Sequence, residues 1–158
     1  MAKKYTDSEI WKRQRWFKKL SKDYKLAFFY IKDMCDNAGV WRIDCGDLME
    51  DTGIEEFDLT DFINQCNKEF DKNTGKLIKK DRLKIIDEKD LWITGFIQFQ
   101  YENKDTGKVC VTHVIAKPAL GKLWLRGLYN EAIKMKYLFV DQPFIYVSPR
   151  SASNGSHR

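Results

Sequence analysis

The sequence predicts an α+β fold, and three observations between Gly39 and Ile93 support that prediction. A short strand over residues 40–43 is followed by two helices that begin at Asp44 and Asp58, each with a capping carboxylate. A turn over residues 71–75 then leads into a long basic strand over residues 77–86, which returns through a turn at 87–90. Placed after an earlier helix, this order predicts a winged helix-turn-helix: a three-helix core with a β-hairpin wing.

Two helices are expected before that segment. Thr6 and Glu9 have the spacing of a capping box, which predicts a helix running through Trp11 toward Leu20. Ser21 is placed to cap the next helix, where one buried stripe is formed by Tyr24, Phe28, Ile31 and Cys35. We expect Trp16 and Phe17, which stand among basic residues, to be core anchors.

The C-terminal third is less uniform. Residues 96–101 fit a helix, and they fit equally a strand that would pair with residues 109–115 in a second hairpin. Pro118 suits the first turn of a last helix. We therefore expect a winged-helix domain over residues 1–115, a C-terminal helix over residues 116–140 as an extension of the fold, and a flexible tail over residues 141–158.

Composition excludes several classes of protein. Apolar residues make up 43% of the chain and aromatic residues 14%, which predicts a folded globule. The longest uncharged apolar run, residues 26–31, is far shorter than the ~20 residues needed to cross a bilayer, and the N-terminus has no apolar signal segment. The four cysteines form no Cys-x-x-Cys pair, and Cys110 with His113 lacks a second ligand pair. We expect a cytoplasmic protein with no membrane partner, metal or cofactor.

Charge is distributed unevenly along the chain. Residues 1–35 hold ten Lys or Arg against four Asp or Glu (+6), and residues 36–75 hold three against eleven (−8). Residues 76–158 hold fifteen against eight (+7). Two basic flanks around an acidic centre predict that any polyanion is held by the flanks.

The candidate DNA contacts fall into three groups. The helix begun by Asp58 offers two amides, each of which can bind adenine through two hydrogen bonds, together with one hydroxyl and one lysine. In order these residues are Thr60, Asn64, Gln65 and Lys68. The basic strand offers phosphate-neutralising groups: Lys76, Lys79, Lys80, Arg82 and Lys84. The first helix offers a second basic cluster: Lys12, Arg13, Arg15, Lys18 and Lys19.

A glycine-rich phosphate loop, a His-x-x-x-His pair and a nucleophile elbow are missing from the sequence, so no enzyme is expected.

Several short stretches together resemble a known family. They are residues 16–21, 25–26, 30–31, 35–41, 48, 52–54 and the Trp92-Ile93-x-x-Phe96-Ile97-x-Phe99-Gln100-Tyr101 pattern. Over about residues 8–128 the chain resembles the N-terminal winged-helix domain of phage replisome-organiser and plasmid-type replication initiation proteins, relatives of primosomal loader domains.

That resemblance implies binding of double-stranded origin DNA or self-association to a homo-oligomer, in the cytoplasm of a bacterial host cell. It also implies that a separate C-terminal part contacts the replicative helicase or its loader, and it favours the helix for residues 96–101. The chain differs from the family in an extra turn over residues 103–108 and in ending at residue 158, so we expect no full helicase-contact domain.

The sequence therefore predicts a DNA-binding winged-helix protein of a phage or other mobile element that acts in DNA replication initiation. The alternative is a non-enzymatic protein–protein adaptor or oligomerisation module, which would use exposed aromatics and the helix over residues 120–138. The basic strand favours the first function, and the acidic centre favours the second.

Overall fold

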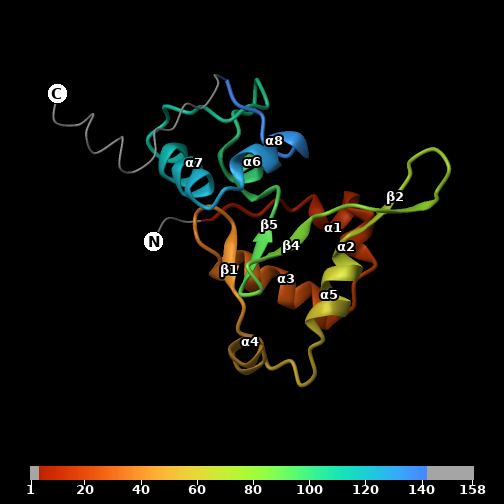
Figure 1. Cartoon of the computed structure of the whole chain (residues 1–158). Helices are drawn as coiled ribbons and strands as arrows, with labels where there is room; N and C mark the ends of the chain where they lie inside the picture. Colours follow the sequence, from red (N-terminus) through yellow and green to blue (C-terminus); the bar gives the residue numbers. More distant parts are fainter. Residues whose placement is uncertain (1–3, 142–158) are drawn as a thin grey trace. The chain divides into compact units, whose positions relative to one another are not determined.

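The computed structural model describes residues 4–141 and divides the chain into two compact units, one ending at Thr94 and the other beginning at Gly95 (Figure 1). This division falls earlier in the chain than the domain boundary expected near residue 115. Helices are combined with short antiparallel strands, so the α+β class is confirmed. The tail expected over residues 141–158 lies outside the described residues except for Asp141. Between residues 4 and 141, every helix is too short or too polar to cross a bilayer.

The first unit begins with two four-residue helices, α1 (Ile10–Arg13) and α2 (Arg15–Lys18), which are separated by Gln14 in an extended conformation. The prediction of one helix opened by a capping box is therefore wrong. No side chain caps α1, and the Thr6 hydroxyl accepts a hydrogen bond from the Lys32 ammonium instead. Lys32 is buried, and a buried cation must find acceptors, so the Thr6 oxygen is used there.

The next helix, α3 (Lys22–Met34), is capped as expected, because the Tyr24 amide donates to Ser21 Oγ at 3.2 Å. Phe28, Ile31 and Cys35 of the predicted stripe are buried. Trp16 and Phe17 are buried against this helix: the Trp16 and Phe28 ring centroids are 5.4 Å apart, edge to face. The expectation that Trp16 and Phe17 are core anchors is confirmed.

After β1 (Val40–Arg42), the chain forms α4 (Cys45–Thr52) and α5 (Leu59–Cys66). Asp44 caps α4 by accepting from the Asp47 amide at 2.9 Å, and Asp58 caps α5 by accepting from the Asp61 amide at 3.1 Å. Both caps were predicted and both are confirmed. On one face of α5, the side chains of Phe62 and Cys66 are completely buried.

The chain from 68 to 93 makes two separate sheets rather than one hairpin. Strands β2 (Lys68–Phe70) and β3 (Leu77–Lys79) form an antiparallel pair that projects from the helices (Figure 1). Strands β4 (Leu83–Ile86) and β5 (Asp90–Ile93) join β1 in a three-stranded sheet of order β1-β5-β4. The single strand predicted over residues 77–86 is therefore wrong.

Asn67 explains the break between the two sheets. Its backbone oxygen accepts from the Lys80 amide at 2.8 Å, which closes the base of the β2–β3 hairpin. Its buried side chain accepts from the Leu83 amide at 2.9 Å and donates to the Leu83 oxygen at 3.0 Å, which fixes the start of β4. One residue at the end of α5 thus satisfies the backbone groups on both sides of the break.

The β4–β5 hairpin turns at Asp87 and Glu88, whose φ angles are +52° and +61°. Within the three-stranded sheet, Val40 pairs with Trp92, and Ile85 pairs with Leu91. The turn predicted at residues 87–90 is present.

The second unit is described by itself. Residues Phe96–Tyr101 form helix α6, which resolves the open alternative in favour of the helix. The helix expected over residues 116–140 is two helices, α7 (Ala116–Leu125) and α8 (Tyr129–Lys134). Gly127, at φ +73°, turns the chain between them, a conformation that costs glycine little. The Trp124 and Tyr129 rings contact each other across this turn, with centroids 5.5 Å apart.

Candidate functional site

The structure brings together two basic segments that are far apart in the sequence. The Arg15 guanidinium lies 4.7 Å and the Lys19 ammonium 5.0 Å from the ring centroid of Phe70, within cation–π distance. Arg15 belongs to α2 and Lys19 follows it directly, whereas Phe70 ends β2. The basic cluster of the first helices and the basic β2–β3 hairpin therefore share one surface.

One face of the hairpin combines cations with apolar side chains. Lys68 pairs with Lys79 and Phe70 pairs with Leu77 in the antiparallel register. Because paired residues and residues two apart point to the same side of a sheet, these four side chains share one face. Glu69 and Ile78, which also pair, lie on the opposite face.

Lys68, Phe70 and Leu77 of that face line a pocket of about 380 Å³, open to solvent, between α2, the end of α5 and the hairpin. Its lining residues are Trp16, Lys19, Leu20, Gln65, Lys68, Phe70 and Leu77. Two of them are cations, one is an amide and four are apolar, so the pocket has an apolar wall with positive charge at its border.

A chain of hydrogen bonds fixes the polar side of the pocket. Lys68 Nζ donates to Gln65 Oε1 at 2.9 Å, and Gln65 Nε2 donates to Asp61 Oδ1 at 3.4 Å. The Tyr24 hydroxyl donates to Asp61 Oδ2 at 2.7 Å. This hydroxyl, followed by the Gln65 amide, lowers the pKa of Asp61, while burial and then the bond to Asp61 raise the pKa of Tyr24. Both polar atoms of the Gln65 amide are therefore engaged within the protein.

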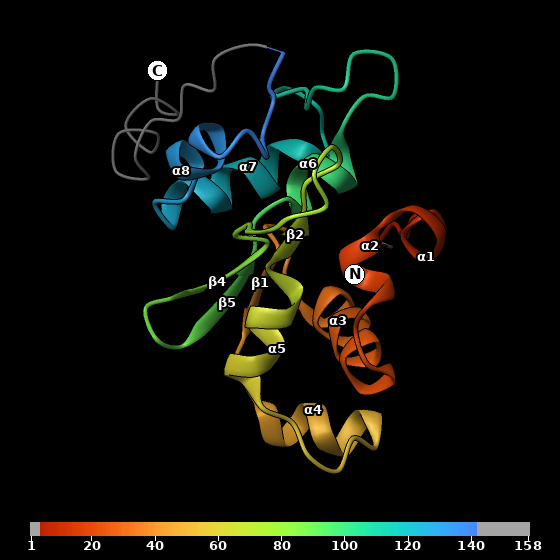
Figure 2. The same cartoon turned by 90° about the vertical axis from the view of Figure 1, so that its right-hand side faces the viewer.

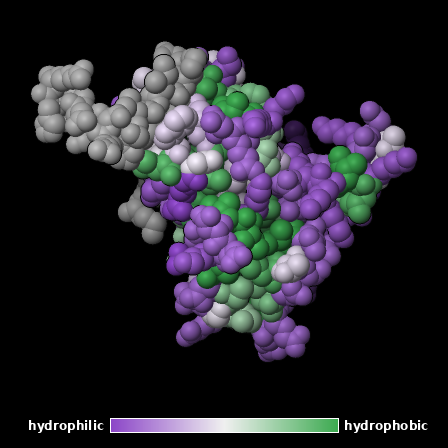
Figure 3. Space-filling view, in the orientation of Figure 1, coloured by the Kyte–Doolittle hydropathy of each residue, from purple (hydrophilic) through white to green (hydrophobic). Residues whose placement is uncertain are grey.

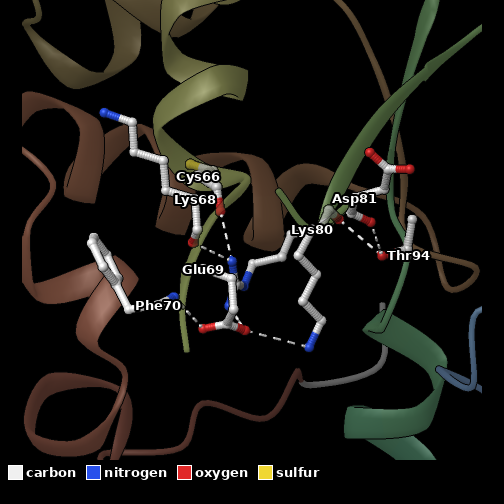
Figure 4. Close-up of polar contacts among 8 residues, drawn as sticks. Cys66, Lys68, Glu69, Phe70, Lys80, Asp81 and Thr94 are labelled. Atoms are coloured by element: carbon white, nitrogen blue, oxygen red, sulfur yellow. Dashed lines mark hydrogen bonds and ion pairs between the residues drawn. The ribbon is translucent and has the colours of Figure 1, made fainter. Parts of the chain in front are cut away.

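Arg82 lies beneath the hairpin rather than on its surface. Nη1 donates to the Lys68 oxygen at 2.7 Å and to the Cys66 oxygen at 3.1 Å, and the guanidinium lies 4.5 Å from the Trp16 ring centroid. The Glu69 carboxylate forms ion pairs with Arg82 Nη2 at 2.7 Å and with Lys80 Nζ at 3.8 Å. Figure 4 shows Glu69 and Lys80 joined in this way beside the Cys66 and Lys68 carbonyls. Only 12% of the Arg82 side chain is exposed, so its donors face the protein.

The other candidate residues divide between exposed and engaged positions. On α5, Thr60 and Asn64 are exposed, and Figure 2 shows this helix between the β4–β5 hairpin and α3. Of the remaining lysines, Lys84 belongs to the other sheet, where it pairs with Trp92 of β5. The Arg13 guanidinium pairs with Glu9 at 2.7 Å at the surface. Exposed positions are also held by Lys12, Lys18, Lys76 and Lys79.

Carboxylates crowd the start of α5. Glu55, Glu56, Asp58 and Asp61 are all exposed there. A polyanion that approaches α5 would meet this negative charge at the helix N-terminus and the cations of the hairpin at its C-terminus. The surface best suited to a polyanion is therefore the hairpin side.

Sequence reasoning missed Phe70, which holds the site together. Its signal was the alternation of Lys68 and Phe70, which places a cation and a ring on one face of a strand. The sequence analysis places Lys68 on the helix begun by Asp58 and leaves Glu69 and Phe70 between that helix and the turn over residues 71–75, so it does not use this alternation.

Among residues 4–141, His, Cys, Asp and Glu side chains do not gather in groups of three that could hold a metal ion. Comparison of the chain with protein-family models, with curated proteins and with solved structures gave no match.

Proposed function

We propose that this chain is a DNA-binding protein with a winged-helix fold. The order α3-β1-α4-α5-β4-β5, with the strands arranged as β1-β5-β4, supports the fold assignment, with the β4–β5 hairpin as the wing. In this interpretation the β2–β3 hairpin is an insertion between α5, which would be the recognition helix, and β4.

The observation that carries the DNA-binding proposal is the stacking of Arg15 and Lys19 on Phe70. It gathers on one side of the molecule cations that the sequence distributes over residues 15–79. We name this set the cationic surface: Arg15, Lys18, Lys19, Lys68 and Lys79. These groups would neutralise phosphates and release counterions from DNA.

In the proposed mechanism, the cationic surface anchors the phosphate backbone and α5 offers Thr60 and Asn64 to a groove. Gln65 is a weaker candidate for base contacts, because its amide already bonds Asp61 and Lys68. The carboxylates at the start of α5 would weaken contacts at that end, so phosphate binding supplies most of the affinity. The assignment to replication initiation in a phage or other mobile element depends on the family resemblance alone.

A salt titration of binding to a duplex tests the proposal. The triple variant Lys18→Ala, Lys19→Ala, Lys79→Ala is compared with Lys108→Ala, Lys117→Ala, Lys134→Ala, which removes the same charge from exposed positions of the second unit. Each lost phosphate contact lowers the slope of log K against log[salt] by about 0.9, so we expect a slope reduced by about 2–3 in the first variant only. Absence of duplex binding at low salt, or equal losses in both variants, would refute the proposal.

One observation favours a second function, that of a protein–protein adaptor. Leu77 and Ile78 of β3 are exposed to 57% and 49%. In Figure 3 an apolar patch lies on the projecting hairpin, bordered by hydrophilic atoms. Exposed apolar strands are suited to pairing with another chain. The adaptor is the better assignment if the protein does not bind a duplex at low salt and if sedimentation shows a dimer that Ile78→Lys disrupts.

A further inference from the structure

We infer that the pocket between α2 and the β2–β3 hairpin binds one unpaired nucleotide of a DNA single strand, with its base against the apolar wall and its phosphate between the lysines. This inference rests on the proposed DNA-binding function and names the form of DNA that this site takes.

The apolar wall fits a base. Phe70 and Leu77 pair across the hairpin, and with Trp16 and Leu20 they form the wall of the pocket. Its volume of about 380 Å³ lies in the range of small-ligand sites, roughly 300–1,000 Å³. Aromatic and apolar side chains beside cations are the usual means by which proteins hold unpaired bases, because every base presents an apolar face.

The charges at its border fit a phosphate. Two cations line the pocket, Lys19 and Lys68, and the Lys68 ammonium donates to a neutral amide, that of Gln65. Lys79 lies outside the lining but directly opposite Lys68 in the register, which places a further like charge on the neighbouring strand. An anion between these groups would relieve their repulsion, so the site has both the charge and the apolar surface of a nucleotide-binding pocket.

A base inside a duplex does not meet these requirements. Its faces are stacked on its neighbours and its edge is paired, so it can enter the pocket only after unstacking, which costs a few kcal/mol. An unpaired base has already lost those contacts. The pocket therefore selects single strands. The groove contacts proposed for Thr60 and Asn64 of α5 need a duplex instead.

The test uses the full chain and three labelled oligonucleotides of equal length: a thymidine single strand, the same backbone with abasic sites, and a duplex. We expect the wild type to bind the thymidine strand more tightly than the abasic strand, on the order of tenfold, since stacking is the difference between them. Leu77→Ser should remove most of this difference. Ile78→Ser, on the opposite face of the same strand and similarly exposed, should preserve it. Both positions are exposed, so neither change should unfold the protein.

A second pair of variants tests the cationic border. Lys19→Ala should weaken binding of the thymidine strand more than Lys18→Ala, which removes the same charge from the adjacent position outside the pocket. Equal losses from the two changes would overturn the assignment of the phosphate to the pocket.

The outcomes separate the two proposals. If the wild type binds duplex but binds the abasic and thymidine strands equally, the pocket takes no base and this inference fails while DNA binding stands. The inference also fails if Ile78→Ser reduces the difference as much as Leu77→Ser does. If none of the three oligonucleotides binds, both proposals fall together.

Discussion

Arg82 Nη2 donates to Glu69 Oε2 at 2.7 Å, and the same guanidinium donates through Nη1 to the Cys66 oxygen at the end of α5. Glu69 belongs to β2, and Arg82 lies between β3 and β4, so Arg82 joins the hairpin to α5. The position of the cationic surface therefore depends on an ion pair beneath it.

We predict that Arg82→Ala lowers the free energy of unfolding by about 2–4 kcal/mol, because it removes donors to two backbone oxygens and leaves the Glu69 carboxylate without its closest cation. Urea denaturation followed by circular dichroism measures the change. Arg13→Ala is the control: its pair with Glu9 is exposed and should contribute about 0–1 kcal/mol. Equal effects of the two substitutions would contradict the internal role of Arg82.

Asn67→Ala should also destabilise the first unit. The Asn67 side chain is 4% exposed, and both of its hydrogen bonds go to the backbone of Leu83. Its loss leaves a buried amide and a buried carbonyl without partners, which costs about 2–4 kcal/mol in the free energy of unfolding. Asn64→Ala, at an exposed position of α5, should change that free energy by less than about 0.5 kcal/mol. Hydrogen exchange of the Leu83 amide provides a local readout, and unchanged protection there in Asn67→Ala would contradict the prediction.

A pH-dependent effect is expected at Asp61. Its pKa lies below the ordinary 3.8, first because the Tyr24 hydroxyl donates to it and then because the Gln65 amide does. Tyr24→Phe should therefore raise the pKa of Asp61, as measured by carbon NMR titration of the carboxylate. Tyr30→Phe is the matched control, since the Tyr30 hydroxyl donates to Asp51 and should leave Asp61 unchanged.

The sign of the stability effect follows from the direction of the shift. A carboxylate with a lowered pKa in the folded state stabilises that state above its unfolded pKa, and this contribution is lost as the pH falls through the folded value. The stability advantage of wild type over Tyr24→Phe should thus be full at neutral pH and shrink below about pH 4. A difference that grows on acidification would contradict the hydrogen bond.

Thiol reactivity offers an independent check of burial. Burial raises the pKa of Cys66, and it raises the pKa of Cys35 to about 12, so neither should react with a maleimide while the protein is folded. The Thr112 hydroxyl lowers the pKa of Cys110, which is half-buried, so Cys110 should react first. Mass spectrometry of briefly labelled, digested protein identifies the site. Early labelling of Cys66 would contradict the packing of α5.

The features that the sequence predicted correctly are those that depend on neighbouring residues. Ser21, Asp44 and Asp58 cap their helices because a capping side chain needs only the amides two or three positions later. The buried stripe of α3 and the turn at Asp87 follow from local periodicity and turn chemistry in the same way.

The features that failed depend on contacts across the fold. Branched apolar residues stand at both ends of residues 77–86, which favoured one strand, whereas in the structure Asn67 bonds backbone groups at Lys80 and Leu83 on the two sides of a break. For the candidate site, the sequence singled out the basic segments that the structure brings together, but not the ring that joins them. Phe70 became part of the site only because α2 lies beside β2, and this contact leaves no trace in the spacing of either segment.

The Asn67 oxygen and the Lys80 amide lie 2.8 Å apart, so the polypeptide leaves the core and re-enters it at almost the same point. The chain between them is therefore a loop that is closed at its base by Asn67 and Arg82. A change in the length of its tip, over residues 71–76, should leave α5 and β4 in place, because the bonds that position them lie at the base.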